Sequence, residues 1–314
     1  MNQSKKLTDG ALLTAIYVIL LLVSIFVPVF SIVAFFLLPI PFTVYTYRYH
    51  WQAAVLMIIA ATILSTLFFT VVAIPMTLLA SFGGLMIGIA MKDGATPYET
   101  LARGAVGFIA GIVALFLFTQ FLLGVDFVGE IDAVLEESLE SSQQFVQSVG
   151  IEQSAEEIEV VESIVFGLKD LAPVGIVIMA VILSFVSQWA TYKLLNRIEQ
   201  TTFKFPPFRD LTFPIVMVWI YLLAMILMFI DLDPHSTLYL AVQNVYVLVG
   251  LLIALQGYSL LFYYNYHKGR SIGIPIIAVI VTLIFPFQFI YIVRMFGIID
   301  IGFSLRERVK KVKK

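Results

Sequence analysis

Apolar stretches of membrane-spanning length recur along almost the whole chain, and they constrain its fold more than any other feature. In lipid, every backbone N–H and C=O must be hydrogen-bonded within the protein, so a run of about 17 or more apolar residues indicates a transmembrane α-helix. We therefore predict an all-α, polytopic transmembrane helical bundle. Eight runs qualify: residues 10–30, 31–47, 53–73, 75–91, 101–123, 171–192, 213–230 and 238–266.

Charge is too scarce for a soluble protein of 314 residues. The chain is 61% hydrophobic and 13% charged, with a mean hydropathy of +0.99. Soluble domains are about 45–50% apolar and about 25% charged. The composition therefore excludes a soluble enzyme, a disordered chain and a nucleic-acid-binding module, and the expected partner is the lipid bilayer.

A ninth apolar region, residues 272–301, is interrupted by Pro286 and carries Arg294 and Asp300. A single crossing would export the basic tail, residues 304–314. Two short arms hinged at Pro286 would keep this tail inside, although each arm would be short for a bilayer. We favour the cytoplasmic tail.

The basic residues predict the orientation of the eight spans, because cytoplasmic loops of membrane proteins are enriched in Lys and Arg. Nearly all of them fall at alternate span ends, which places the N-terminus in the cytoplasm, and the opposite side holds only Lys169. The cytoplasmic set is Lys5, Lys6, Arg48, Lys92, Arg103, Lys193, Arg197, Lys204, Arg209, Lys268 and Arg270.

The polar segment 125–168 is acidic and carries two helical apolar repeats, one on each side of Gly150. Residues 126–162 contain 11 acidic side chains, and no Lys or Arg occurs between Arg103 and Lys169. The repeats predict two amphipathic helices folded as an extracytoplasmic hairpin, with their apolar faces together or against the membrane domain. The hairpin is either a cap that docks a partner or covers a cavity, or an acidic decoration exposed to solvent.

No motif for catalysis, phosphate binding or metal binding occurs, and the chain has no cysteine. We therefore expect neither an enzyme nor a bound cofactor. Polar residues inside spans are the remaining candidates for function, because burying them in lipid is costly. They are Gln120, Gln188, Gln256, Arg294 and Asp300. We expect Arg294 and Asp300 to form a structural ion pair through a break near Gly297; a transport site is the alternative.

Small residues repeat along several spans at the spacing that lets helix backbones approach closely. We expect three of these stripes to serve packing within the chain. They are Ala80, Gly84 and Gly88, then Gly104, Gly107 and Gly111, then Gly250, Ala254 and Gly257.

Four segments together resemble the YybS family of uncharacterised membrane proteins of Firmicutes-type bacteria. They are Leu7-Thr-Asp-Gly-Ala-Leu-Leu-Thr-Ala-Ile-Tyr17, Leu38-Pro-Ile-Pro-Phe42, Gly84-Leu-Met-Ile-Gly88 and Phe296-Gly-Ile-Ile-Asp300. The resemblance covers essentially the whole chain. It implies a multi-pass protein of the bacterial cell membrane and no particular activity.

The first six spans also resemble the substrate-binding S-components of energy-coupling-factor vitamin transporters. In that group an AxxxA motif on the first helix docks the coupling subunit, and Ala11 and Ala15 match it in place. The resemblance implies an S-component-like domain, residues 1–200, with coupling and ATPase subunits as partners. Residues 201–303 would add C-terminal membrane helices. S-components have a long loop after helix one, which this chain lacks, so no ligand-binding residue carries over.

Two functions remain open. The first is a transport-related subunit that binds a small solute and works with partner subunits, because the chain has no ATPase site of its own. The second is a scaffold or regulator that docks partners through the acidic hairpin or the basic tail.

Overall fold

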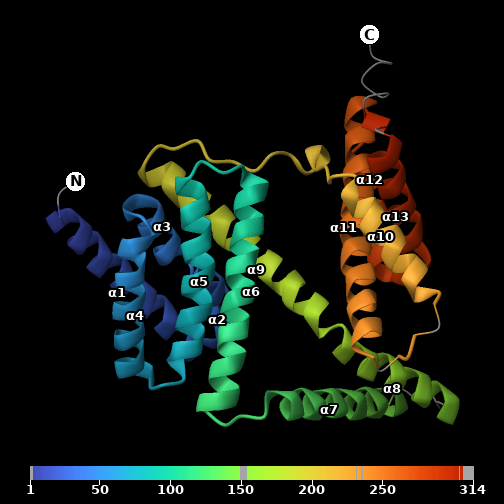
Figure 1. Ribbon diagram of the computed structural model, residues 1–314, viewed down its shortest axis with the longest axis horizontal. Helices are drawn as coiled ribbons and strands as arrows, with labels where there is room; N and C mark the ends of the chain where they lie inside the picture. The colour runs from blue at the N-terminus through green and yellow to red at the C-terminus, as the bar shows by residue number, and fades with distance from the viewer. Residues whose placement is uncertain (1–2, 149–153, 231, 235, 304, 307–314) are drawn as a thin grey trace. The chain divides into compact units, whose positions relative to one another are not determined.

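The structure, a computed structural model, describes residues 3–148, 154–230, 232–234, 236–303 and 305–306, and within these residues the regular elements are all helical (Figure 1). The predicted all-α fold is therefore confirmed. The elements are α1 (Gln3–Phe26), α2 (Pro28–Leu37), α3 (Ile40–Tyr49), α4 (Trp51–Phe69), α5 (Ala73–Lys92), α6 (Pro97–Leu122), α7 (Phe127–Ser148), α8 (Ala155–Asp170), α9 (Ala172–Ile198), η1 (Phe208–Asp210), α10 (Val216–Met228), α11 (Thr237–His267), α12 (Gly273–Ile284) and α13 (Pro286–Phe303).

Among the described residues, seven helical segments are long and apolar enough to cross a membrane, with α2 and α3 counted together as one segment, Pro28–Tyr49. The predicted seventh span is shorter than expected. It forms only α10, whose 13 residues reach about 20 Å and so fall short of the roughly 30 Å of hydrocarbon in a bilayer. The chain divides into two compact units, residues 1–166 with 175–205 and residues 167–174 with 206–314.

Close contacts between backbones hold unit 1 together, as the small-residue stripes predict. A Cβ atom on Gly84 would meet the carbonyl of Pro39, and one on Gly107 would meet the carbonyl of Phe82. The large side chains between these helices are fully buried, among them Tyr17, Phe42 and Phe108. Packing within the chain is therefore the confirmed role of the stripes on α5 and α6.

The predicted insert helices are α7 and α8, and α7 leaves the end of α6 at a steep angle (Figure 1). Their apolar faces are not covered as expected. Leu139 is buried, but Val134, Phe145 and Leu168 are more than half exposed. The break expected at Gly150 lies outside the described residues.

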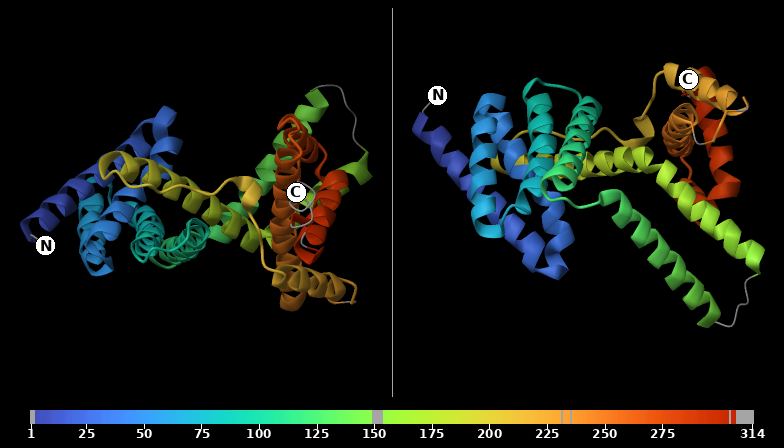
Figure 2. Two further views of the ribbon diagram at one scale, coloured as in Figure 1. Left: turned by 90° about the horizontal axis from the view of Figure 1, so that it is seen from above. Right: turned by 60° about the horizontal axis from the view of Figure 1, so that its bottom comes forward.

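In unit 2, α11 and α13 lie side by side (Figures 1 and 2). Their backbones approach closely where Gly257 meets Val293 and where Gly297 meets Ile253. Between them in the sequence, α12 ends at Ile284 and α13 begins at Pro286, which confirms the predicted hinge. The Tyr263 hydroxyl lies 3.5 Å from the carbonyl of Arg306, so the residues that follow α13 lie near the C-terminal end of α11. Residues 307–314 of the predicted basic tail lie outside the described residues.

Candidate functional site

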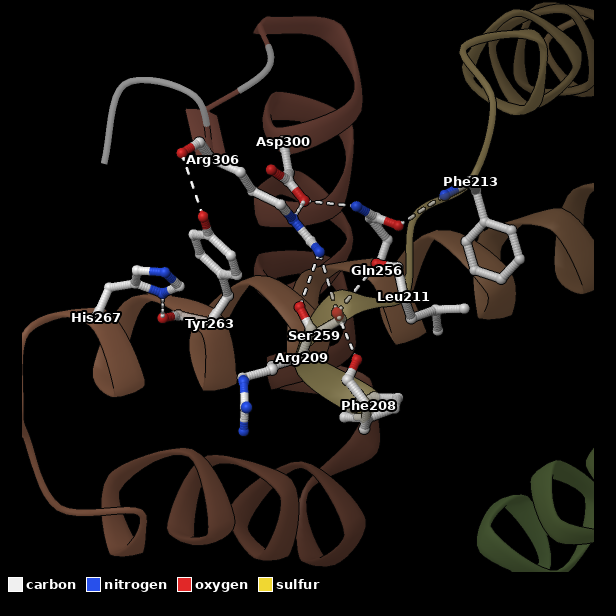
Figure 3. A network of polar contacts seen from close by, with 10 residues as sticks. All are labelled: Phe208, Arg209, Leu211, Phe213, Gln256, Ser259, Tyr263, His267, Asp300 and Arg306. Atoms are coloured by element: carbon white, nitrogen blue, oxygen red, sulfur yellow. Dashed lines mark hydrogen bonds and ion pairs between the residues drawn. The ribbon is translucent and has the colours of Figure 1, made fainter. Parts of the chain in front are cut away.

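A buried carboxylate organises the C-terminal end of α13 (Figure 3). Asp300 is 4% exposed, and its Oδ2 accepts hydrogen bonds from Nε of Arg306 at 2.9 Å and from Nε2 of Gln256 at 2.5 Å. The Oε1 atom of Gln256 accepts from the backbone N–H of Phe213 at 3.0 Å. Two hydrogen bonds of the Gln256 side-chain amide thus join α11 to α13 and to the segment before α10, beside the ion pair of Asp300 with Arg306.

The predicted ion pair between Arg294 and Asp300 is wrong, because the partner of Asp300 is Arg306. No break occurs near Gly297, since α13 is helical from Pro286 to Phe303. Six residues of unbroken helix separate the two side chains by about 9 Å along the axis. From the sequence, Arg306 is expected to belong to the basic tail. The one signal for its pairing with Asp300 is that it is the first basic residue after α13.

Arg306 also fixes the segment that follows unit 1 in the chain (Figure 3). Its Nη1 donates to the carbonyl of Arg209 at 2.8 Å, and its Nη2 donates to Oγ of Ser259 at 3.0 Å. The Ser259 hydroxyl lies 2.8 Å from the carbonyl of Phe208 and 3.1 Å from that of Leu211. The 3₁₀ turn η1 is therefore held at both its ends against α11.

Arg294 lies on α13, and its guanidinium contacts the middle of α11 near two aromatic rings. Its guanidinium carbon is 5.7 Å from the ring centre of Tyr246 and 5.5 Å from that of Tyr291. The residue is 9% exposed, and its Nε atom has no hydrogen-bond partner in the described part of the chain. A Cβ on Gly250 would occupy the position of this guanidinium. The absence of a side chain at Gly250 therefore leaves the space that the Arg294 guanidinium fills between α11 and α13.

Gln188 belongs to a buried polar seam between α6 and α9 in unit 1. Its Nε2 donates to the carbonyl of Pro97 at 2.9 Å and to the hydroxyl of Tyr192 at 2.8 Å, while Oε1 has no partner among the described residues. The side-chain oxygens of Ser187 and Thr191 likewise have no partner there. The sequence reading missed the other members, although Ser184, Ser187 and Thr191 recur at one-face spacing along α9.

The remaining predicted residues are separate from these clusters. Gln120 is half-buried near the end of α6 and interacts with other residues there. Ala11 and Ala15 are exposed on α1, which buries Leu13 and Tyr17 on another face. The structure therefore brings together only Gln256 and Asp300 of the seven predicted site residues.

A second polar cluster ties three helices of unit 1 at one end. The guanidinium of Arg48 on α3 lies 3.2 Å from a carboxylate oxygen of Asp9 on α1 and 2.6 Å from one of Glu199, just after α9. Tyr49 donates to the same Asp9 carboxylate at 2.7 Å.

Deeper in this unit, a cavity of only about 10 Å³ lies between α2, α5, α6 and α9.

Comparisons with known proteins agree with the resemblance to the YybS family. The family described as "Predicted membrane protein (DUF2232)" matches residues 15–301. The uncharacterized protein YybS of Bacillus subtilis (strain 168) is 30% identical over 321 residues, which cover 99% of this chain and 100% of that protein. No solved structure matches the chain. The chain therefore belongs to the DUF2232 family of predicted membrane proteins and is similar over its full length to YybS.

Proposed function

We propose that this protein is a subunit of a transport-related membrane assembly and docks a partner membrane protein through the outward face of α1. The observation that carries the proposal is that Ala11 and Ala15 are both exposed on α1, a helix long and apolar enough to span a membrane. The same two residues match the docking motif of the S-components.

The packing of α1 leaves this face free for a partner. Its inward face buries Leu13, Tyr17 and Leu21, and the Tyr17 hydroxyl donates to Oγ1 of Thr77 at 2.8 Å. Lipid gives little drive for association between apolar helices, so close backbone approach at small residues is a main source of affinity. Alanines four residues apart on the outward face therefore suit contact with another transmembrane helix.

The tight packing deep in unit 1 favours the docking role over a solute site among α2, α5, α6 and α9. The cavity of about 10 Å³ between α2, α5, α6 and α9 is about the space that one water needs. Large side chains such as Phe42 and Phe108 fill the surrounding core. The proposed partners are a membrane coupling subunit and ATPase subunits, with the N-terminus of this chain and its basic tail in the cytoplasm.

Affinity purification of the full chain in mild detergent tests the proposal. The wild type is expected to recover a membrane partner together with an ATPase pair, and Ala15→Trp is expected to lose them. Ala60→Trp is the matched control, because Ala60 is an exposed alanine on the spanning helix α4. A wild-type protein that recovers no such partners, or an equal loss in both variants, would contradict the proposal.

A scaffold or regulatory role is the second candidate. It is favoured by the exposed apolar residues on α7 and α8, such as Phe145 and Ile164, within the acidic insert. In this case Phe145→Ser together with Ile164→Ser would abolish recovery of a partner, while Ala15→Trp would leave that recovery unchanged. The two roles thus make opposite predictions for the same purification.

A further inference from the structure

A pocket of about 300 Å³ opens beside the C-terminal end of α11 in unit 2. Two arginines and an asparagine lie among mostly apolar walls. The lining residues used below are Phe208, Arg209, Asn265, Arg270, Ile272 and Pro275. Within the described residues, neither arginine forms an ion pair with a carboxylate. The pocket therefore presents positive charge that the described part of the chain does not neutralise.

Arg209 is held in place by its own backbone and by an aromatic ring. Its carbonyl accepts from Arg306, and the adjoining Phe208 carbonyl accepts from Ser259 (Figure 3). The guanidinium carbon lies 3.8 Å from the ring centre of Tyr266. The aromatic ring covers one flat face of the guanidinium, and the N–H groups at its edge stay available to a ligand.

Arg270 reaches the same pocket because the chain reverses at the end of α11. Gly269 has φ of +64°, a left-handed conformation that glycine adopts without a steric cost. The next N–H, that of Arg270, then donates to the carbonyl of Asn265 at 2.9 Å, which is the 6→1 bond of a Schellman motif. This capping motif turns Arg270 back toward α11.

Asn265 supplies a polar group at the pocket with an unused hydrogen-bond acceptor. The residue is 5% exposed, and its Nδ2 donates to the carbonyl of Leu261 at 2.9 Å. Its Oδ1 has no partner in the part of the chain that the structure describes. A buried acceptor of this kind costs about 1–3 kcal/mol unless a donor reaches it. A ligand hydroxyl would satisfy it.

We propose that this pocket binds the headgroup of an anionic glycerophospholipid. The N–H edges of Arg209 and Arg270 hold the phosphodiester, and Oδ1 of Asn265 accepts a hydrogen bond from a headgroup hydroxyl. Guanidinium groups suit phosphate oxygens because they donate two parallel hydrogen bonds. The site goes beyond the proposed docking role and involves no residue of α1.

The surroundings favour a lipid over a soluble phosphate ester. Apolar side chains, including Ile272 and Pro275, line the pocket beside the arginines, where they suit the glycerol backbone and the start of an acyl chain. The pocket also lies at the end of a 31-residue apolar helix whose last turns carry Tyr258, Tyr263, Tyr264 and Tyr266. Tyrosines concentrate where membrane-spanning helices meet the headgroups, and basic pockets there recognise anionic lipids.

Native mass spectrometry of the full chain in detergent tests the proposal with phosphatidylglycerol and phosphatidylcholine as probes. We expect phosphatidylglycerol to bind at least tenfold more tightly than phosphatidylcholine. Arg209→Gln with Arg270→Gln should weaken phosphatidylglycerol binding by about tenfold or more, since each charged hydrogen bond contributes that order of affinity. Asn265→Leu should weaken phosphatidylglycerol but leave phosphatidic acid, which has no headgroup hydroxyl beyond the phosphate, unchanged.

Lys268→Gln is the matched control, because this neighbouring basic residue does not line the pocket. An equal loss in Lys268→Gln and the double arginine variant would indicate general charge attraction and would overturn the site. Competition by glycerol 3-phosphate at the affinity of the lipid would assign the pocket to a soluble ester instead. Failure to discriminate between phosphatidylglycerol and phosphatidylcholine would also overturn the proposal, whatever the outcome for partner docking.

Discussion

Asp300 and Arg306 form a buried ion pair, with 2.9 Å between Oδ2 and Nε, and each side chain is also hydrogen-bonded to α11, Asp300 through Gln256 and Arg306 through Ser259. The side chains are 2% and 12% exposed. Breaking a buried pair leaves one charge without compensation, whereas removing both charges is far less costly. The pair therefore gives unit 2 a contact whose contribution can be measured one partner at a time.

Removal of Arg306 alone should destabilise the protein strongly. We expect Arg306→Gln to lower the free energy of unfolding by about 3–5 kcal/mol, because it leaves Asp300 charged and buried. The Arg306→Gln, Asp300→Asn double variant should recover much of the loss. Thermal unfolding of purified protein in one detergent measures both. Arg103→Gln removes two exposed ion pairs, with Asp93 and Glu99, and should cost at most about 1 kcal/mol, so equal effects at both arginines would contradict the prediction.

The glycines on α13 should respond oppositely to alanine. A Cβ on Gly297 would meet the carbonyl of Ile253 and force α11 and α13 apart, so Gly297→Ala should lower the unfolding temperature. A Cβ on Gly302 would meet nothing within 4 Å, and Gly302→Ala should raise stability by up to about 1 kcal/mol through helix propensity. The same detergent assay compares the two, and a stabilising Gly297→Ala would show that this contact is not close.

The polar seam of unit 1 gives a test of unsatisfied hydroxyls. Thr191→Val removes a fully buried oxygen that has no partner among the described residues and should stabilise the fold by about 1–3 kcal/mol. Thr43→Val is the control, because its hydroxyl donates to the carbonyl of Pro39 at 3.0 Å and its loss should not stabilise. A destabilising Thr191→Val would show instead that this hydroxyl binds a buried water or ion.

Arg294 should be dispensable for stability, unlike Arg306. It has no carboxylate partner in the described structure, and a charged side chain at mid-membrane depth is costly. Arg294→Met keeps the length of the side chain and should raise the unfolding temperature, whereas Arg306→Met should lower it. A strongly destabilising Arg294→Met would indicate that its contacts with Tyr246 and Tyr291 outweigh the cost of desolvation.

Hydropathy predicted the helices well because it depends on segment length and local composition. The positions of proline and glycine predicted the hinge at Pro286 and the packing role of Gly84 and Gly107, because these residues act through the backbone at their own positions. The sequence did not predict the ion pair of Arg306 or the polar seam of Ser187 and Thr191. Their roles depend on which distant residue each one meets, and the one-dimensional pattern carries no such information.

The bond from Arg306 to the carbonyl of Arg209 spans 97 residues of chain and has a consequence for biogenesis. The turn that holds Arg209 is synthesised first, but the group that fixes it leaves the ribosome only after α10, α11, α12 and α13. Before Arg306 is synthesised, the segment before α10 is held only by its bonds to Ser259 and Gln256 of α11. The bond from Arg306 is therefore the last one added to this segment, so a ribosome-stalled intermediate ending before Arg306 should be cut by protease there more readily than the full chain.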